Sequence, residues 1–302
     1  MIDKSKIFRR GGPSARTNLT NEFVAALPYE TKLRKRSING SDAAFCPRKV
    51  VLSLNWDASV KVTVGAASPL YFATGNAFHD VAAQTFKKMG VLVANELSIR
   101  VGAVHGYVDD LIFDESTGGL KIIDIKTCGK LPDAIKPSQL EQLMTYALLT
   151  GVWNASILYM SRSVAGYDGK PYIKEIEASM SEASLKRHAL VIAASMFYNR
   201  EKIVPPKPEY RTSFSNCGWC PFKNFGCWSN DEGDFHDHVS GVKFAEEENE
   251  ADLAVIDAWA NDLINRRWKF LDKTAELVRH HRGANIKLLE EAIKNMKEVE
   301  SE

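Results

Sequence analysis

Apolar and polar positions alternate most regularly near the middle of the chain, in two runs that flank a polar segment. The first run covers residues 107–113, and the second, residues 120–126, is very apolar. The segment 114–119, Asp-Glu-Ser-Thr-Gly-Gly, has the composition of a turn, so the pattern predicts a β-hairpin. Because strand side chains repeat every second residue, Asp124 and Lys126 should point to the same face of the second strand.

Similar patterns on both sides of this hairpin predict the other elements of the core. Before it, we expect a helix from residue 41, a second helix over 72–89, and a strand at 97–101 that Glu96 begins. After it, we expect a helix from a capping box at Ser138–Glu141 to Gly151, strands at 155–160 and 172–178 joined by a turn at 167–170, and a helix from a second capping box at Ser179–Glu182 to Arg200. This order predicts an α/β or α+β core with a mixed sheet flanked by helices.

The helix predicted over 72–89 has one apolar stripe that should be buried. We expect the stripe to consist of Phe78, Ala82, Thr85 or Phe86, and Met89. His79 lies beside it, and taken alone a histidine there is more often a hydrogen-bonded core residue than a metal ligand.

Residues 229–302 read as an acidic loop followed by helices, which we treat as a helical C-terminal appendage. A long helix is expected from about residue 246 to 281, and a further helix after Gly283. The apolar positions are near heptad spacing, but Arg267 and Thr274 interrupt the seam. Packing on the core and self-association through a coiled coil are therefore both open, and the sequence predicts no function for this part.

The composition is that of an ordinary globular protein. The chain has 302 residues, of which 45% are hydrophobic, enough for one large domain or one domain with an appendage. No apolar run approaches the ~18 residues of a membrane span, and the start of the chain is polar, unlike a signal peptide. We therefore expect a cytoplasmic protein without a membrane partner. A net charge of +1 excludes a globally basic nucleic-acid coat, and the lack of a P-loop motif excludes a motor.

Residues 1–40 are locally basic, with nine lysines or arginines against three acids. We predict a partly ordered arm. A solvated arm is the simpler interpretation, and contact with phosphates is the alternative.

Cysteines form the second chemical signal. Cys217, Cys220 and Cys227 fall within eleven residues. In a cytoplasmic chain this clustering favours a metal site over disulfides. Three ligands need a fourth, and the candidates are Cys46, Cys128, His236 and His238. Zinc and an iron–sulfur cluster both accept four thiolates.

Another chemical signal is the pair of Asp124 and Lys126 at the end of the second hairpin strand. A carboxylate from each strand beside one lysine is costly in so apolar a setting unless something binds there, and a divalent metal is the natural candidate. Taken alone, Asp124-Ile125-Lys126 usually marks only a solvated strand face, and Gln142 with Tyr146, four residues apart, only the polar edge of a helix.

Together these motifs resemble the RecB-like branch of the PD-(D/E)XK nuclease superfamily, in particular its iron–sulfur members, such as the CRISPR-associated Cas-four exonucleases and the AddB nuclease domain. The matching elements, in chain order over about residues 41–228, are Cys46-Pro47-Arg48, Gly75-x-x-x-His79, Gly106-x-x-Asp109, Asp124-Ile125-Lys126, Gln142-x-x-x-Tyr146 and the three cysteines Cys217, Cys220 and Cys227. Two departures are Asp124, where the family more often has Glu, and the lack of a proline before Asp109.

The resemblance implies a restriction-endonuclease-like core over residues 41–228 that hydrolyses DNA, as single strands or from ends, in recombination, repair or replication. It implies a 4Fe–4S cluster on Cys46 and the three later cysteines, with zinc as the alternative. A helicase or recombinase partner and a bacterial, archaeal or phage-infected cell would fit such an enzyme.

The resemblance also implies a role for each site residue. Mg²⁺ or Mn²⁺ would be held by Asp109, Asp124, His79 and the backbone carbonyl of Ile125. Lys126 would orient or deprotonate the attacking water, Glu96 would act through a bound water, and Gln142 and Tyr146 would position Lys126 or the scissile strand. Asp110 stands next to Asp109, and by strand alternation it should face the opposite side, so we expect Asp109 to be the ligand.

A rival hypothesis is a non-catalytic DNA-binding or scaffold protein on the same fold, with a structural metal site. The nuclease hypothesis is favoured because a decayed site would be expected to lose one of His79, Asp109, Asp124 or Lys126, and all four are present.

Overall fold

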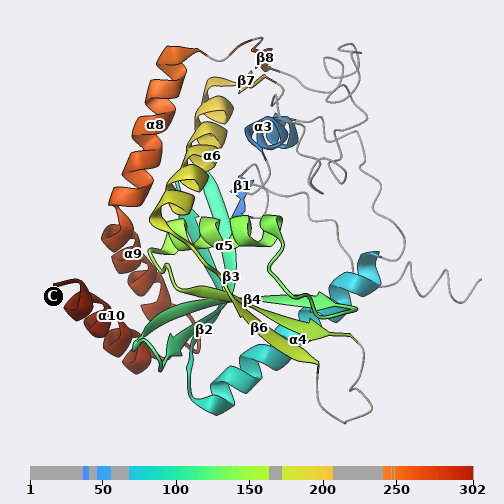
Figure 1. Ribbon diagram of the computed structural model, residues 1–302, viewed down its shortest axis with the longest axis vertical. Helices are drawn as coiled ribbons and strands as arrows, with labels where there is room; N and C mark the ends of the chain where they lie inside the picture. Colours follow the sequence, from blue (N-terminus) through green and yellow to red (C-terminus); the bar gives the residue numbers. More distant parts are fainter. Residues whose placement is uncertain are drawn as a thin grey trace, which may run out of the picture.

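The computed structural model describes residues 37–40, 46–55, 68–162, 172–206, 241–245, 247 and 249–301. Its centre is a six-stranded mixed sheet with helices on both faces (Figure 1). This confirms the predicted α/β class with a mixed sheet flanked by helices. The order along the main path of the sheet is β1-β3-β4-β5-β6, and β2 pairs with the other edge of β3.

The strands of this sheet are β1 (Ile38–Asn39), β2 (Leu92–Val101), β3 (Val104–Asp114), β4 (Gly119–Cys128), β5 (Ala155–Ser161) and β6 (Ile173–Glu177). Two short strands, β7 (Ile203–Val204) and β8 (Lys243–Phe244), form a separate parallel pair. The predicted hairpin is present as β3 and β4, which pair antiparallel.

The hairpin strands stay paired only along half of their length. Their ladder runs from Asp114 and Gly119 at the turn to Asp110 and Ile123. Beyond that point β4 continues beside β5 as a parallel neighbour, whereas Val104, at the start of β3, pairs with Ile38 of β1. The sheet therefore forks where the β3–β4 ladder ends, and residues 106–109 of β3 border the fork.

Helices α4 (Ser68–Met89) and α5 (Pro137–Thr150) lie on opposite faces of the sheet, α4 below it and α5 above it in Figure 1. On the α4 face a small cluster contains Ala82, Ile123, Ile125 and Met160. The α5 face carries the main core, to which α3 (Pro47–Asn55) and α6 (Glu182–Glu201) also contribute. The alternation of Ile123 and Ile125 with Asp124 thus places the acid on the side of α5.

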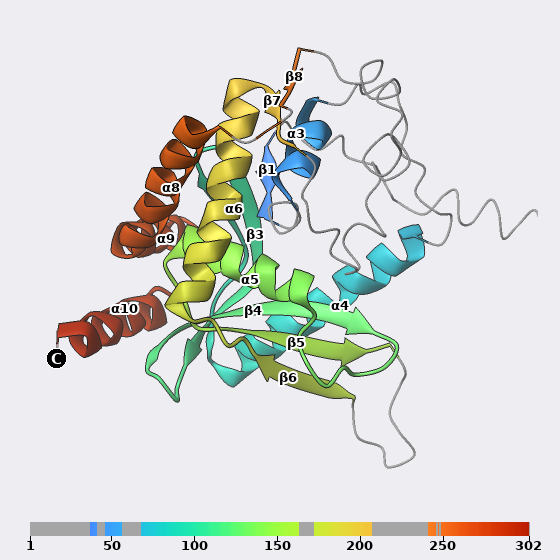
Figure 2. The same ribbon diagram turned by 45° about the horizontal axis from the view of Figure 1, so that its top comes forward.

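The C-terminal helices pack on this main core. They are α8 (Glu250–Asn265), α9 (Arg267–Arg279) and α10 (Ile286–Ser301). Ile256, Phe270 and Leu289, one from each helix, belong to the same buried cluster as the strands. Figure 2 shows α8 running alongside α6. Of the two arrangements left open by the heptad spacing, packing on the core is the one observed.

Several predicted boundaries are wrong in detail. Helix α5 begins at Pro137, so Ser138 does not cap it. The cap of α6 is Ser181, whose hydroxyl accepts a hydrogen bond from the Ser184 N–H, and not Ser179. Strand β2 begins at Leu92, four residues before Glu96. The single long helix predicted over 246–281 is divided at Arg266 into α8 and α9.

The buried stripe of α4 is shorter than predicted. Ala82 is buried, and Phe78 and Phe86 pack against its cluster. Thr85 is exposed, and Met89 is 63% exposed, so neither residue belongs to the buried stripe. Within the part of the chain that the structure describes, no helix is long and apolar enough to cross a membrane.

Candidate active site

Asp109 occupies the fork between β3 and β4. It stands one residue outside the last paired position of β3, and its Oδ2 accepts a hydrogen bond of 2.8 Å from the backbone N–H of Ile125. This contact joins the two strands where their own ladder has ended. The pKa of Asp109 is raised to about 8, first because the carboxyl is buried and second because the Asp124 carboxylate lies close to it.

Asp124 and Lys126 share one face of β4, as strand alternation predicts. The Lys126 Nζ lies 2.8 Å from the Asp124 Oδ2. Asp124 is only 1% exposed, and its Oδ1 has no hydrogen-bond partner among the residues that the structure describes. Burial by itself would lower the pKa of Lys126, but the carboxylates of Asp124 and Asp109 raise it, so this lysine keeps its proton in the resting site.

His79 reaches the fork from α4. Its Nδ1 lies 3.6 Å from the Asp109 Oδ1. Burial and the nearby Lys126 ammonium lower the pKa of His79, which favours the neutral ring with one unprotonated nitrogen. A neutral imidazole is the form that binds metal ions.

Glu96 and Asp110 form a second pair of acids, and the charge of Glu96 acts on both Asp110 and His79. Asp110 is 1% exposed, and its Oδ1 has no hydrogen-bond partner within the described ranges. Burial, and then the charge of Glu96, raise the pKa of Asp110 to about 7. Glu96 has a φ of +47° inside a strand, a conformation that non-glycine residues seldom adopt away from functional sites. The backbone of Glu96 is therefore strained, and its predicted role through a bound water stays a prediction.

Gln142 and Tyr146 contact each other on α5, because residues four apart lie on the same side of a helix. The Gln142 Nε2 donates a hydrogen bond of 2.8 Å to the Tyr146 Oη. Tyr146 is 5% exposed, and burial raises its pKa above the ordinary value, so its hydroxyl stays protonated. Asp124 and Asp109 act in the same direction, which places this tyrosine within the electrostatic reach of both acids.

The Tyr146 ring explains a glycine of the β3 motif. A Cβ added at Gly106 would lie 2.9 Å from the Tyr146 Cε1, and one added at Gly40 would lie 2.7 Å from the same atom. Both positions must therefore lack a side chain for Tyr146 to occupy its place. At Gly75, in contrast, a Cβ would meet nothing within 4 Å, so the structure gives no steric reason for glycine there.

Two further residues next to the site were not predicted from the sequence. Tyr159 of β5 is the parallel register partner of Lys126 and is 2% exposed. Its hydroxyl donates a hydrogen bond of 2.6 Å to the Gln139 Oε1, and the same oxygen accepts from the Lys136 N–H at 3.4 Å, at the start of α5. The predicted strand at 155–160 contained the signal for Tyr159, but its register against β4 did not follow from the sequence.

The donor set fits a hard divalent cation. The buried Asp124 and the partly buried Asp109 lie beside one ammonium, the Asp124 Oδ1 has no partner among the described residues, and the pKa of the neighbouring imidazole is lowered, so oxygen and nitrogen donors are available to a cation. Among the described residues, no three acid, histidine or cysteine side chains stand close enough to hold one ion. Binding would therefore require the acids to exchange their present contacts with Lys126 and Ile125 for the metal.

Of the four cysteines predicted to bind a cluster, Cys217, Cys220 and Cys227 lie outside the described residues. Cys46 directly precedes α3, where its Sγ accepts a hydrogen bond from the Lys49 N–H at 3.3 Å. Two residues later, the buried Arg48 donates a hydrogen bond of 2.6 Å to the carbonyl oxygen of Pro205.

The start of α3 is thus held against the segment that leads toward Cys217. Cys128, the other described cysteine, is partly buried at the end of β4.

Several solved structures match the chain at low similarity, and two of them are named here. The crystal structure of SSO0001 is 17% identical, with a TM-score of 0.39 over 72% of this chain and 96% of that one. The crystal structure of an alkaline exonuclease, LHK-Exo from Laribacter hongkongensis, is 14% identical, with a TM-score of 0.37 over 55% of this chain and 89% of that one. No protein-family model matches the chain, and no curated protein matches it significantly. Similarity at this level does not show a function for this chain.

Proposed function

We propose that this protein is a metal-dependent deoxyribonuclease that hydrolyses phosphodiester bonds. The observation that supports it best is the fork itself, where two buried acids, one lysine and one neutral histidine converge from β3, β4 and α4. Apolar strands rarely retain such a group without a ligand, because each buried charge opposes folding.

Asp109, Asp124 and His79 would hold Mg²⁺ or Mn²⁺, together with the backbone carbonyl of Ile125. When bound, such an ion supplies a nucleophilic water and neutralises charge that develops on the phosphate.

The other residues of the candidate site would each have a role in hydrolysis. The Lys126 Nζ lies 2.8 Å from the Asp124 Oδ2, and its ammonium would orient the attacking water and offset charge on the phosphate oxygens. The Gln142–Tyr146 pair presents two polar groups on the same face of α5, which can position Lys126 or the scissile strand. Glu96 would act through water.

The substrate form, the pathway and the cluster are also part of the proposal. We infer an exonuclease acting on single strands or DNA ends in recombination, repair or replication, in company with a helicase or recombinase. We also retain the 4Fe–4S cluster on Cys46, Cys217, Cys220 and Cys227, with zinc as the alternative. The contact between Arg48 and Pro205 supports the long-range closure that this ligand set requires.

The cleavage assay uses end-labelled single- and double-stranded DNA with Mg²⁺ or Mn²⁺. Wild-type protein is expected to cut at least one substrate, and Lys126→Ala should abolish cleavage while DNA binding and folding stay nearly intact. Lys294→Ala, on the exposed face of α10, is the matched control and should cut normally. Wild-type protein that is inert with both metals on every substrate would favour the non-catalytic scaffold.

Metal analysis of anaerobically purified protein tests the cluster separately. We expect brown protein that contains iron, and Cys46→Ser should lose metal and stability together, whereas Cys128→Ser should be mild. Stoichiometric zinc in colourless, active protein would exclude the iron–sulfur cluster and leave the nuclease proposal intact.

A further inference from the structure

Three exposed basic residues gather at the carboxyl ends of β4 and β5, beside the candidate active site. They are Lys130, Lys136 and Arg162, here called the basic rim. The Arg162 N–H donates a hydrogen bond of 2.8 Å to the carbonyl of Cys128, the last residue of β4. Burial raises the pKa of the Cys128 thiol, and the positive charges of Arg162 and Lys136 act in the opposite direction, so both side chains lie near Cys128. The first rim residue, Lys130, therefore follows Lys126 by four residues, just past the end of β4.

The opposite end of the same strands carries the opposite charge. Around the β3–β4 turn and the facing part of β6 lie Asp114, Glu115, Glu175 and Glu177, with Lys121 as the only base on these strand ends within the described residues. Lys121 is already neutralised, since its Nζ lies 2.7 Å from Glu175 and 3.2 Å from Glu177. A chain with a net charge of +1 thus has a strongly polarised sheet.

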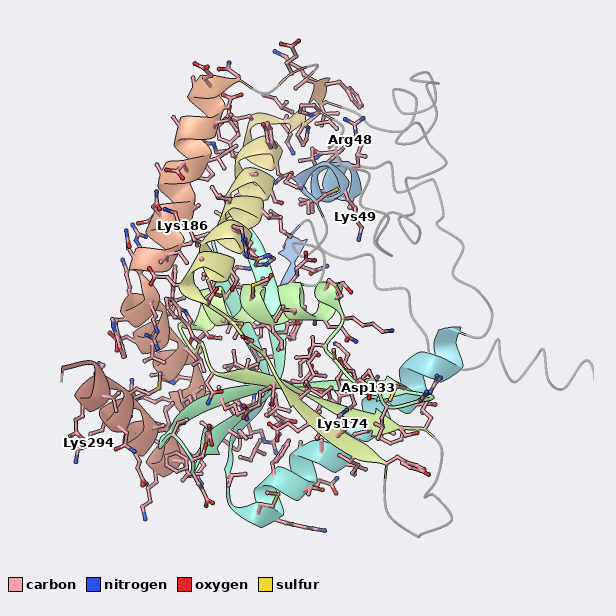
Figure 3. All side chains as sticks on the ribbon, in the orientation of Figure 1. Arg48, Lys49, Asp133, Lys174, Lys186 and Lys294 are labelled. Carbon is pink, nitrogen blue, oxygen red and sulfur yellow. The ribbon has the colours of Figure 1, made fainter. Side chains whose placement is uncertain are left out.

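The loop that carries the rim is held in place by a separate ion pair. Lys174 of β6 donates a hydrogen bond of 3.0 Å to the carbonyl of Pro132 and lies 3.6 Å from Asp133. Figure 3 shows Asp133 and Lys174 together at this end of the sheet. Lys130 and Lys136, in contrast, make no ion pair with any acid that the structure describes, so their charge remains available to a ligand.

We propose that the basic rim binds the phosphate backbone of the nucleic-acid strand that enters the candidate site. The proposal rests on the nuclease function and adds where the substrate lies: over the carboxyl ends of β4 and β5, and away from the acidic end. Three cations on one rim suit a chain of evenly spaced phosphates better than a single small anion, and the repulsion at the acidic end disfavours the reverse path.

The test measures binding without cleavage, with the full-length protein in EDTA and a fluorescent 20-nucleotide single strand. The rim variant combines Lys130→Gln, Lys136→Gln and Arg162→Gln. The control variant, Lys186→Gln, Arg187→Gln and Lys294→Gln, removes the same charge from exposed positions of α6 and α10. Figure 3 shows Lys186 and Lys294 on the other side of the molecule from Asp133 and Lys174.

If each rim residue neutralises one phosphate, the slope of log affinity against log salt should fall by about 2 in the rim variant, since each contact contributes about 0.7 on single strands. Between 50 and 200 mM salt, the wild type should then lose about 20-fold more affinity than the rim variant. The control variant should keep the wild-type slope.

Equal slopes of log affinity against log salt in the rim and control variants would refute the proposal that the basic rim binds the strand. This outcome is distinguishable from failure of the nuclease proposal. If the wild type cleaves DNA but the rim variant has the wild-type salt slope, only the rim proposal is refuted. If the rim variant has a smaller slope but the wild type never cleaves DNA, the rim proposal stands and the nuclease proposal is refuted.

Discussion

Replacing Asp109 with asparagine should make the metal-free protein more stable while it abolishes activity. The pKa of this carboxyl rises from 3.8 to about 8 on folding, because the group is buried next to Asp124. At pH 7 the unfolded chain is ionised at this position and the folded chain is mostly protonated, so folding must take up a proton at a cost of up to about 4 kcal/mol. Asparagine avoids that cost and still offers an oxygen to the Ile125 N–H.

The net gain should be smaller than this upper value. The amide N–H groups of asparagine need hydrogen-bond partners of their own, which offsets part of the gain. We expect about 1 to 2 kcal/mol, which for a chain of this size raises the melting temperature by roughly 1.5 to 3 °C. The sign also fixes a pH dependence. The folded state binds the extra proton between pH 3.8 and about 8, so wild-type stability falls through this range as pH rises, and Asp109→Asn should flatten the fall.

Thermal unfolding in EDTA at pH 6, 7 and 8, and again with millimolar Mn²⁺, measures both effects. Wild-type protein should be stabilised by Mn²⁺, because a ligand that binds only the folded state raises its stability, and Asp109→Asn should lose this response. Asp110→Asn is the matched control. Its pKa is raised to about 7, so removing the charge should also stabilise the metal-free protein, but the Mn²⁺ response and most cleavage should remain. The reasoning is refuted if Asp109→Asn is less stable than wild type in EDTA, or if both variants lose the Mn²⁺ response equally.

Three further predictions concern the surroundings of the site. Gly106→Ala should push the Tyr146 ring from its place, which lowers the free energy of unfolding by about 1 to 3 kcal/mol and reduces cleavage. Gly75→Ala, the control, should leave stability and cleavage intact or slightly raise stability. Denaturant unfolding and the cleavage assay compare the two variants, and equal losses would contradict the steric argument. Tyr159→Phe removes one hydrogen bond next to Lys126, so kcat should fall about threefold to tenfold with KM unchanged, and an unaltered kcat in steady-state kinetics would show that this hydroxyl does not position the lysine. Burial lowers the pKa of His188 to about 4, whereas in the unfolded chain the pKa of this histidine is 6.5. Only the unfolded chain therefore gains a proton between pH 7 and pH 5, and wild-type stability should fall by about 2 kcal/mol over this range. Urea unfolding of His188→Gln should not show this loss.

The hairpin and the placement of Asp124 beside Lys126 followed from the sequence because both depend on local rules. Strand alternation needs only the order of residues, and the polar turn between two apolar runs fixes which strands pair. The contact between Gln142 and Tyr146 is local in the same way, since a helix brings residues four apart together. These contacts are the parts of the candidate site that needed no knowledge of the fold.

The fork could not be predicted, because it depends on partners distant in the chain. Pairing of Val104 with Ile38, and of β4 with β5, draws the hairpin strands apart beyond Asp110. Nothing between residues 106 and 126 signals that the ladder stops there. The same non-local register explains why Tyr159 was missed, since only the alignment of β5 on β4 places it next to Lys126.

Helix boundaries failed for a different reason, which is competition between neighbouring signals. A proline at the first helical position begins α5 although a serine that could cap a helix follows at once. At α6 two serines compete, and Ser181 makes the capping hydrogen bond. The division between α8 and α9 at Arg266 carries neither glycine nor proline, so no local residue predicts it.

The cost of the buried acids also bears on the choice between a nuclease and a scaffold. In a protein that only binds DNA, Asp109 would weaken folding without return, and asparagine at this position would relieve its repulsion with Asp124 while preserving the shape of the fork. Both acids are present, together with the neutral histidine and the lysine that a metal-assisted hydrolysis would use. A scaffold should tolerate the loss of these charges in every functional measurement, whereas a nuclease should gain stability and lose cleavage with the same substitution. Opposite changes in stability and cleavage are therefore the outcome that only the catalytic hypothesis predicts.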